Sequence, residues 1–119
     1  MGRLTTHVLD TANGRPAAGV RVRVYALDAS DGTRLLLRDV TTNTDGRCDA
    51  PLLEGADFGV GRYEIVFGAG AYFAALGVVQ SQPPFVEDVV LRFGIADPKQ
   101  HYHVPLLVSP WSYSTYRGS

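Results

Sequence analysis

Residues 20–27 read VRVRVYAL, and this stretch decides the fold. Its three valines fall on one face of an extended chain, together with Ala26, and its two arginines fall on the other face with Tyr25. Successive side chains of a β-strand point to opposite faces. A period of two therefore predicts a strand with one buried face and one polar face.

Other segments of the chain carry the same signals. They are rich in β-branched and aromatic residues, which favour extended backbone. The further predicted strands are residues 4–9, a segment through Leu35, Leu37 and Val40, residues 62–67, residues 85–95, and the strands within residues 102–118. Pro105 and Pro110 lack the N–H group that a strand ladder uses, so each of them marks a strand end, an edge or a bulge.

Turns and one helix separate these strands. Residues 12–19, ANGRPAAG, predict a turn, and the Asp45-Gly46 pair predicts a tight turn within residues 43–47, NTDGR. Residues 68–77, GAGAYFAALG, are rich in alanine and bounded by glycine, which predicts one short helix. Seven or eight short strands with at most one helix predict an all-β sandwich, in a single domain of residues 1–119.

Charge is almost balanced in this sequence. Eleven basic and 12 acidic residues give a net charge of −1, and the basic residues are scattered along the chain. A nucleic-acid-binding protein needs a positive stripe that can displace counterions. The sequence therefore predicts that nucleic acid is not a partner.

Membrane and secretory signals are also missing from the sequence. No apolar run approaches the roughly 20 residues of a membrane span, and the start MGRLTTHVLD lacks the apolar stretch of a secretory signal. The only cysteine, Cys48, cannot form an intramolecular disulfide, and we interpret it as a reduced, partly buried thiol. These features predict a soluble, cytoplasmic protein with no membrane partner.

Three histidines are the first candidates for chemistry. His7 lies in the middle of a predicted strand, and His101 and His103 are two residues apart, so that both face the same way at a spacing of roughly 6.5 Å along a strand. This pair raises the hypothesis of a zinc site. However, no cysteine or carboxylate lies nearby in the sequence to complete the set of ligands. Each histidine also has a structural interpretation, as a side chain tied by a hydrogen bond.

Arg47 and the end of the chain are the remaining candidates. Arg47 follows the Asp45-Gly46 turn, where a solvated charge is the ordinary interpretation. The chain finishes with Tyr116, Arg117, Gly118 and Ser119 after an apolar run, although chain ends are usually frayed. Tyr116 could cover the edge of the sandwich, and Arg117 could belong to a loose tail. Taken one at a time, these residues do not establish a function.

Taken together, they resemble a known family. The stretches LTTHVLDTANGRPAAGV (4–20), TNTDGR (42–47) and HYHVPLLVSPWSYSTYRGS (101–119), with YEIVF and YF between them, are similar to the transthyretin-like 5-hydroxyisourate hydrolases. The resemblance covers nearly the whole chain in the expected order, and the Tyr-Arg-Gly-Ser ending is its most specific element. It implies the transthyretin-like (prealbumin-like) β-sandwich.

The resemblance also implies an activity. Hydrolases of this family add water to the C6 carbonyl of 5-hydroxyisourate, an unstable product of urate oxidation. The N1–C6 bond breaks, which gives 2-oxo-4-hydroxy-4-carboxy-5-ureidoimidazoline. The resemblance implies neither a metal nor an organic cofactor. It implies a homotetramer, a dimer of dimers, with the site between subunits.

Roles for individual residues follow from the same resemblance. His7 and His103 would orient and deprotonate the attacking water, with His7 also contacting the substrate. Arg47 would bind the substrate and stabilise negative charge on its carbonyl oxygen. The tail would complete the site, with Tyr116 holding the ring and Arg117, Gly118 and Ser119 shaping the cleft floor. His101 lies outside the recognised part of the motif and is interpreted as structural.

Two other functions fit parts of the sequence. One is a transthyretin-like carrier that holds a small aromatic ligand in a tetramer channel without converting it. Vertebrate transthyretin lacks the catalytic histidines and the Tyr-Arg-Gly-Ser ending, so their presence here favours the enzyme. The other is a purely structural sandwich, which predicts that the named residues do not cluster in space.

Overall fold

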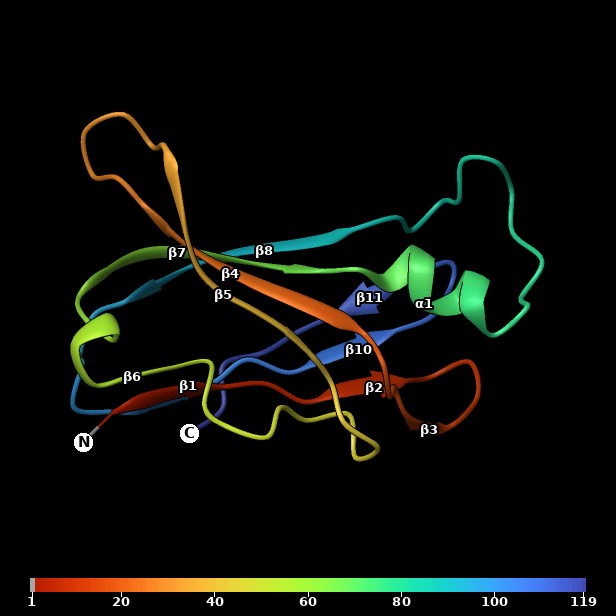
Figure 1. Cartoon of the computed structure of the whole chain (residues 1–119), viewed down its shortest axis with the longest axis horizontal. Helices are drawn as coiled ribbons and strands as arrows, with labels where there is room; N and C mark the ends of the chain where they lie inside the picture. Colours follow the sequence, from red (N-terminus) through yellow and green to blue (C-terminus); the bar gives the residue numbers. More distant parts are fainter. Residues whose placement is uncertain (1) are drawn as a thin grey trace.

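The predicted strand at residues 20–27 lies at the centre of a sheet in the structure, a computed structural model that describes residues 2–119 (Figure 1). Residues 2–119 fold into eleven strands, some only two residues long, one α-helix and one 3₁₀ helix. In chain order they are β1 (Arg3–Thr5), β2 (Val8–Asp10), β3 (Arg15–Pro16), β4 (Arg21–Leu27), β5 (Arg34–Thr41), β6 (Leu53–Glu54), η1 (Gly55–Asp57), β7 (Gly61–Phe67), α1 (Ala69–Ala75), β8 (Val89–Ile95), β9 (His101–His103), β10 (Leu106–Val108) and β11 (Tyr113–Ser114).

One layer of the molecule is an antiparallel sheet in the order β5-β4-β7-β8. The valines at positions 20, 22 and 24 are at most 1% exposed, while Arg21 on the opposite face is exposed, as the period of two predicts. Tyr63, Ile65 and Phe67 of β7 are buried on the same side of the sheet. The buried faces of β4 and β7 thus form one wall of the core.

The second layer contains parallel strands from the two ends of the chain. β1 pairs with β9 and β2 pairs with β10, and the sequence offset between partners is the same in both pairs. Antiparallel neighbours complete the layer, with β6 next to β1, β3 next to β2, and β11 next to β10. The amino-terminal and carboxyl-terminal segments therefore run side by side along this layer (Figure 1).

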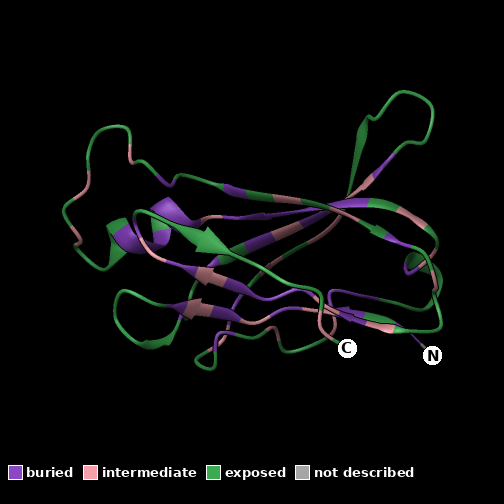
Figure 2. Ribbon diagram, turned by 180° about the vertical axis from the view of Figure 1, so that it is seen from behind, coloured by how far each residue is buried: buried purple, intermediate pink, exposed green. Residues whose placement is uncertain are grey.

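The core lies between the two layers, and the exposed residues are concentrated in the connecting loops (Figure 2). Leu4, Val8, Phe67 and Leu106 are fully buried. Helix α1 lies within the segment predicted to be helical, and it buries Tyr72 and Phe73 against this core. The β-sandwich with one short helix that the sequence predicts is therefore confirmed.

Some boundaries differ from those expected. The strand predicted at residues 4–9 is divided into β1 and β2, and His7 between them forms an isolated bridge to Arg47. The strand predicted at residues 85–95 begins only at Val89. The segment before it folds over α1, where the carbonyl oxygen of Glu87 accepts a hydrogen bond from the Gly70 amide at 2.8 Å.

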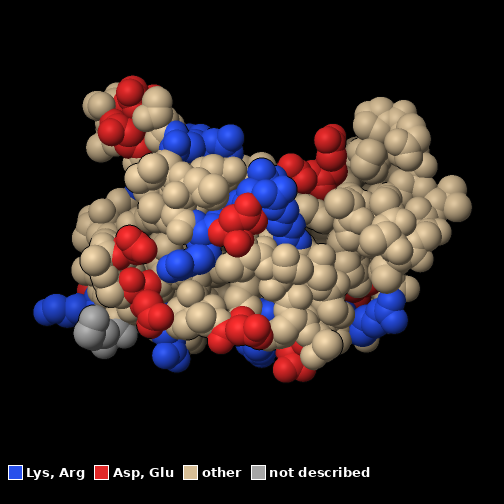
Figure 3. Space-filling view, in the orientation of Figure 1, with Lys and Arg blue, Asp and Glu red and all other residues tan. Residues whose placement is uncertain are grey.

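Several surface features bear on the expectations from the sequence. Basic and acidic side chains lie next to one another on the face shown in Figure 3, as their scatter along the sequence suggests. Cys48 is a half-buried free thiol, as predicted. Among the residues that the structure describes, no helix is long and apolar enough to cross a membrane.

Candidate active site

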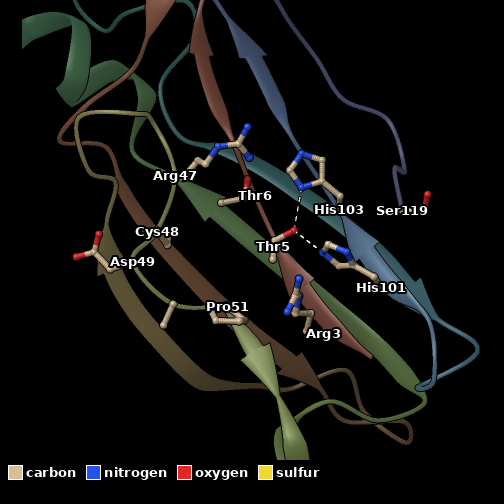
Figure 4. Close-up of a pocket in the computed structure, with 11 residues that line it drawn as sticks. Arg3, Thr5, Thr6, Arg47, Cys48, Asp49, Pro51, His101, His103 and Ser119 are labelled. Carbon is tan, nitrogen blue, oxygen red and sulfur yellow. Dashed lines mark hydrogen bonds between the residues drawn. The ribbon is translucent and has the colours of Figure 1, made fainter. Parts of the chain in front are cut away.

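A cleft of about 440 Å³ opens beside strands β1 and β9 (Figure 4). Its walls come from four parts of the sequence: the first strand, the segment after the Asp45-Gly46 turn, strand β9 and the last residue. The lining is mostly polar and includes two arginines and two histidines. The lining residues are Arg3, Thr5, Thr6, Arg47, Cys48, Asp49, Ala50, Pro51, His101, His103 and Ser119.

A threonine lies between two histidines in this cleft. The Thr5 hydroxyl is 2.8 Å from Nε2 of His101 and 2.9 Å from Nδ1 of His103 (Figure 4). The two imidazole rings have centroids 6.4 Å apart and are tilted edge to face. All three side chains therefore belong to one hydrogen-bonded group.

The parallel register of β1 and β9 creates this group. Thr5 is the direct partner of His103, and His101 lies two residues earlier on the same face of the neighbouring strand. The alternating residues Leu4 and Tyr102 point into the core instead. Strand periodicity thus sends the polar side chains to the outer face, where the cleft lies.

The turn before Arg47 brings that residue to the same place. The Asn43 side-chain oxygen accepts hydrogen bonds from the amides of Asp45 and Arg47, at 2.9 and 3.1 Å. Gly46 has a φ of +74°, and its carbonyl accepts a 2.8 Å hydrogen bond from the Val8 amide. A Cβ atom at Gly46 would collide with the Val8 carbonyl oxygen, so only glycine fits this turn.

His7 lies next to Arg47 but does not line the cleft. The two residues form an isolated antiparallel bridge through their backbones. Nε2 of His7 is 2.8 Å from the backbone carbonyl oxygen of Asp45. A carbonyl only accepts, so Nε2 carries the proton, and in the neutral ring Nδ1 is the basic nitrogen.

The tail is held against β9 by its backbone. Gly118 and His103 exchange two backbone hydrogen bonds, of 2.7 and 3.1 Å. A Cβ atom at Gly118 would be 3.3 Å from Cβ of His103, which is a tight contact. Gly118 therefore allows the tail to approach closely enough to bring Ser119 to the cleft.

Tyr116 and Arg117 point to another part of the surface. Both line a second groove, next to strand β8, on the other side of the tail. The Arg117 guanidinium donates a 2.9 Å hydrogen bond to Gln100 and lies 4.3 Å from the centroid of the Tyr102 ring. The structure thus brings Arg47, His103 and Ser119 into one cleft, places His7 beside it, and directs these two residues elsewhere within one chain.

Burial and neighbouring cations keep the cleft histidines neutral. Burial lowers the pKa of His103, and the neighbouring Arg47, His101 and His7 side chains lower it further. Burial, followed by the charges of Arg3 and Arg117, lowers the pKa of His101. Burial and the nearby Asp49 raise the pKa of the Cys48 thiol, which disfavours a thiolate nucleophile. A neutral imidazole at His103 can accept a proton at neutral pH.

Sequence reasoning missed the position of His101. The sequence interpretation treats it as structural, yet it lines the cleft and shares Thr5 with His103. The two-residue spacing already put both histidines on one strand face, but His101 lies outside the motif that carries the family resemblance. Within residues 2–119, no three histidine, cysteine or acidic side chains are grouped closely enough to share a metal ion.

Comparisons with known proteins identify relatives of this chain. The sequence model of the HIUase/Transthyretin family matches residues 4–118. A protein named 5-hydroxyisourate hydrolase 2 from Rhizobium meliloti (strain 1021) is 61% identical over 118 residues, which are 99% of this chain and 97% of that protein.

Solved structures show the same fold. The crystal structure of an (S)-allantoin synthase superposes with a TM-score of 0.93 at 51% identity; the match covers 99% of this chain and only 44% of that longer chain. Sea bream transthyretin, solved in complex with thyroxine, gives a TM-score of 0.86 at 30% identity and covers 98% of this chain and 94% of its own. The fold is therefore common to proteins with different names and ligands.

Proposed function

The chain belongs to the HIUase/Transthyretin family, and we propose that it is an enzyme that hydrolyses 5-hydroxyisourate. The proposal rests above all on one observation. Arg47 and the neutral His103, which are far apart in the sequence, face the same small polar cleft. A proton acceptor and a fixed positive charge in one cleft are what hydrolysis of a cyclic amide requires.

The first step is the attack of water on the C6 carbonyl of the substrate. Nε2 of His103 takes a proton from the water, because the other ring nitrogen, Nδ1, is bonded to Thr5. We assign His7, which lies beside the cleft and not in its lining, to orienting the water through its basic Nδ1, and one of the two histidines returns a proton to the leaving nitrogen N1. A positioned base of this kind contributes typically about 10²–10⁴-fold to the rate.

Arg47 stabilises the negative charge that develops on the carbonyl oxygen. Its planar guanidinium can donate to two acceptors of a flat heterocycle at once. One preorganised donor to an oxyanion is worth roughly 3 kcal/mol in enzymes where it has been removed. Opening of the N1–C6 bond then gives 2-oxo-4-hydroxy-4-carboxy-5-ureidoimidazoline.

The proposed assembly is a homotetramer made of two dimers, in the cytoplasm. Among the residues that the structure describes, β8 is an edge strand of one layer and β11 an edge strand of the other, and a second copy could pair with either. Tyr116 and Arg117 line the groove next to β8. In this assembly Tyr116 and Arg117 would contact the substrate bound in the cleft of a neighbouring subunit. Gly118 and Ser119 would complete the cleft of their own chain.

The experiment that tests the function is an absorbance assay. 5-Hydroxyisourate is generated from urate, the protein is added, and the decay of the substrate's ultraviolet absorbance is compared with its decay in buffer. Acceleration is the expected result. The match to a thyroxine-binding transthyretin favours a carrier as the second candidate. A folded protein that leaves the decay rate unchanged would support that carrier and overturn the enzyme.

A further inference from the structure

Hydrogen-bond chemistry limits how Thr5 can bond to two histidines. A threonine hydroxyl has one proton to donate and two lone pairs to accept with. Its oxygen is within bonding distance of one nitrogen from each ring, and no other partner of this hydroxyl is found within residues 2–119. Its proton therefore goes to one ring, and the other ring can donate its own N–H to the oxygen.

The position of Arg47 indicates which ring accepts. In Figure 4 the His103 nitrogen that is not bonded to Thr5 lies on the side of the ring that faces Arg47. A guanidinium has donors only, so an N–H at this nitrogen would oppose another donor, whereas a lone pair is attracted. His103 consequently carries its proton on Nδ1 and donates it to Thr5, and the Thr5 hydroxyl donates to His101.

We propose that His101 is a positioning residue that acts through the Thr5 hydroxyl to fix the tautomer of His103, so that Nε2 of His103 faces the cleft as the base. His101 supplies the acceptor that takes the Thr5 proton. Without this acceptor the hydroxyl can turn and donate to Nδ1 of His103. That reversal would move the ring proton of His103 to Nε2, and the ring could no longer take a proton from water there.

The relay also supports the charged state of His103. When Nε2 gains a proton, the positive ring keeps its Nδ1–H bond to Thr5, and Thr5 keeps its bond to His101. Hydrogen bonds to a charged donor are roughly twice as strong as neutral ones. Burial and the charges of Arg3 and Arg117 lower the pKa of His101, which keeps its Nε2 available as an acceptor.

The catalytic part of this inference rests on the proposed hydrolysis, but the tautomer does not. The first experiment therefore uses no substrate. Nitrogen-15 NMR of the folded protein at neutral pH reports which nitrogen of each imidazole carries the proton. In the unmodified protein we expect His103 to be protonated on Nδ1. In His101→Leu and in Thr5→Val we expect the proton to move to Nε2, which is the tautomer that a free imidazole side chain prefers.

Conservative variants and a matched control complete the design. Thr5→Ser keeps the hydroxyl, and His101→Gln keeps an acceptor near the former Nε2, so both should retain the Nδ1 proton on His103. Thr11→Val is the control, because it removes a hydroxyl that donates at 3.1 Å to a backbone carbonyl of strand β10, away from the cleft. A His103 ring protonated on Nε2 in the unmodified protein, or unchanged in both His101→Leu and Thr5→Val, would overturn the proposal.

Kinetics then test the consequence. Thr5→Val should lower kcat by at least about tenfold, within the roughly 10⁴-fold that a wrong tautomer costs another catalytic histidine. KM should change little, and Thr5→Ser should restore most of kcat. Equal kcat in Thr5→Val and Thr11→Val would overturn the positioning role. If the unmodified protein shows no hydrolysis, the proposed function is wrong. The NMR experiment uses no substrate, so it still decides whether Thr5 and His101 fix the tautomer of His103.

Discussion

The parallel strands from the two ends of the chain pair in one register, but the side chains at the two ends of this strand pair have different roles. β2 with β10 and β1 with β9 share one register, and in both pairs alternate side chains enter the core. At the β2 end, the buried Asp10 carboxylate accepts two hydrogen bonds from Asn13 and one from the Tyr72 hydroxyl, at 2.7 to 2.9 Å. At the β1 end, Thr5 and the two histidines bond to one another and face a cleft.

The difference lies in how completely each polar group is satisfied within the chain. Every oxygen of Asp10 has a donor from the protein, and the carboxylate links β2 to helix α1. Within residues 2–119, the His103 ring bonds through Nδ1 alone, which leaves Nε2 open toward the cleft. A buried polar group whose hydrogen bonds are all made within the protein stabilises the fold. A polar group at a cleft with a free donor or acceptor can bind a ligand. Mutations at the two ends should therefore separate activity from stability.

The largest effect on activity is expected from His103→Asn, at the cleft end of the strand pair. The asparagine amide can replace Nδ1 in the bond to Thr5, but it has no group at the position of Nε2. Loss of the base should lower the rate of 5-hydroxyisourate hydrolysis by about 10²–10⁴-fold. Because His103 is not part of the core, the free energy of unfolding should change by less than about 1 kcal/mol. Absorbance kinetics and denaturant unfolding would measure the two effects.

The same variant also has an outcome that would remove His103 from the mechanism. Turnover close to that of the unmodified protein, with unfolding unchanged, would mean that another group accepts the proton. A large loss of stability would instead place His103 with the structural end of the strand pair and contradict the comparison.

Gly46→Ala should lower both stability and activity, because the turn at Gly46 bonds to Val8 and also positions Arg47 at the cleft. The left-handed φ of +74° alone costs a residue with a side chain of the order of 1–3 kcal/mol, and the new methyl group also meets the Val8 carbonyl. The turn must shift, and Arg47 shifts with it. We expect a lower unfolding midpoint and a reduced kcat/KM. Gly14→Ala is the control, since it too has a positive φ but open space around it and no contact with the cleft.

The comparison with Gly14→Ala isolates the position of Arg47. Both variants carry the strain of positive φ, so both should lose some stability. Only Gly46→Ala should lose activity per folded molecule. An equal loss of activity in the two variants would show that the turn does not position Arg47.

The sequence predicted the antiparallel layer better than the parallel one. In β4 the burial alternates from Arg21 to Tyr25, and in β7 the apolar residues Tyr63, Ile65 and Phe67 recur at every second position; such a signal is local. The pairing of β1 with β9 joins residues almost a hundred positions apart, and no local pattern encodes its register. The break between β1 and β2 and the bridge from His7 to Arg47 could not be predicted for the same reason, because both depend on contacts between distant parts of the chain.

The candidate site follows the same rule. His7, Arg47, His103 and the tail were identified through their resemblance to a family, since single residues carried too little information. The part played by Thr5 and His101 could not be predicted, because a hydroxyl between two imidazoles depends on the register of two strands. The position of Tyr116 and Arg117 next to strand β8 depends in turn on how the tail crosses β9.

Asp10→Asn tests the structural end of the strand pair, with the smallest expected effect on activity. Burial tends to raise the pKa of Asp10, but hydrogen bonds from Asn13 and Tyr72 outweigh it and hold the pKa below its ordinary value. Asparagine offers one acceptor oxygen instead of two. Its NH₂ group is a donor and would face the donors of Asn13 or Tyr72. We expect a loss of about 1–3 kcal/mol in the free energy of unfolding, with kcat of the folded protein unchanged.

The pH dependence of unfolding gives this last prediction a direction. A carboxyl whose pKa is lower in the folded state stabilises the fold above its unfolded pKa of about 3.9, and this contribution disappears as the pH falls through the folded value. The unmodified protein should therefore lose stability progressively below about pH 5, and part of this slope should be missing in Asp10→Asn. Asp39→Asn is the matched control, because it breaks a solvent-exposed pair with Arg21 and should change stability far less. Equal changes in the two variants would show that the network around Asp10 adds nothing beyond a surface ion pair.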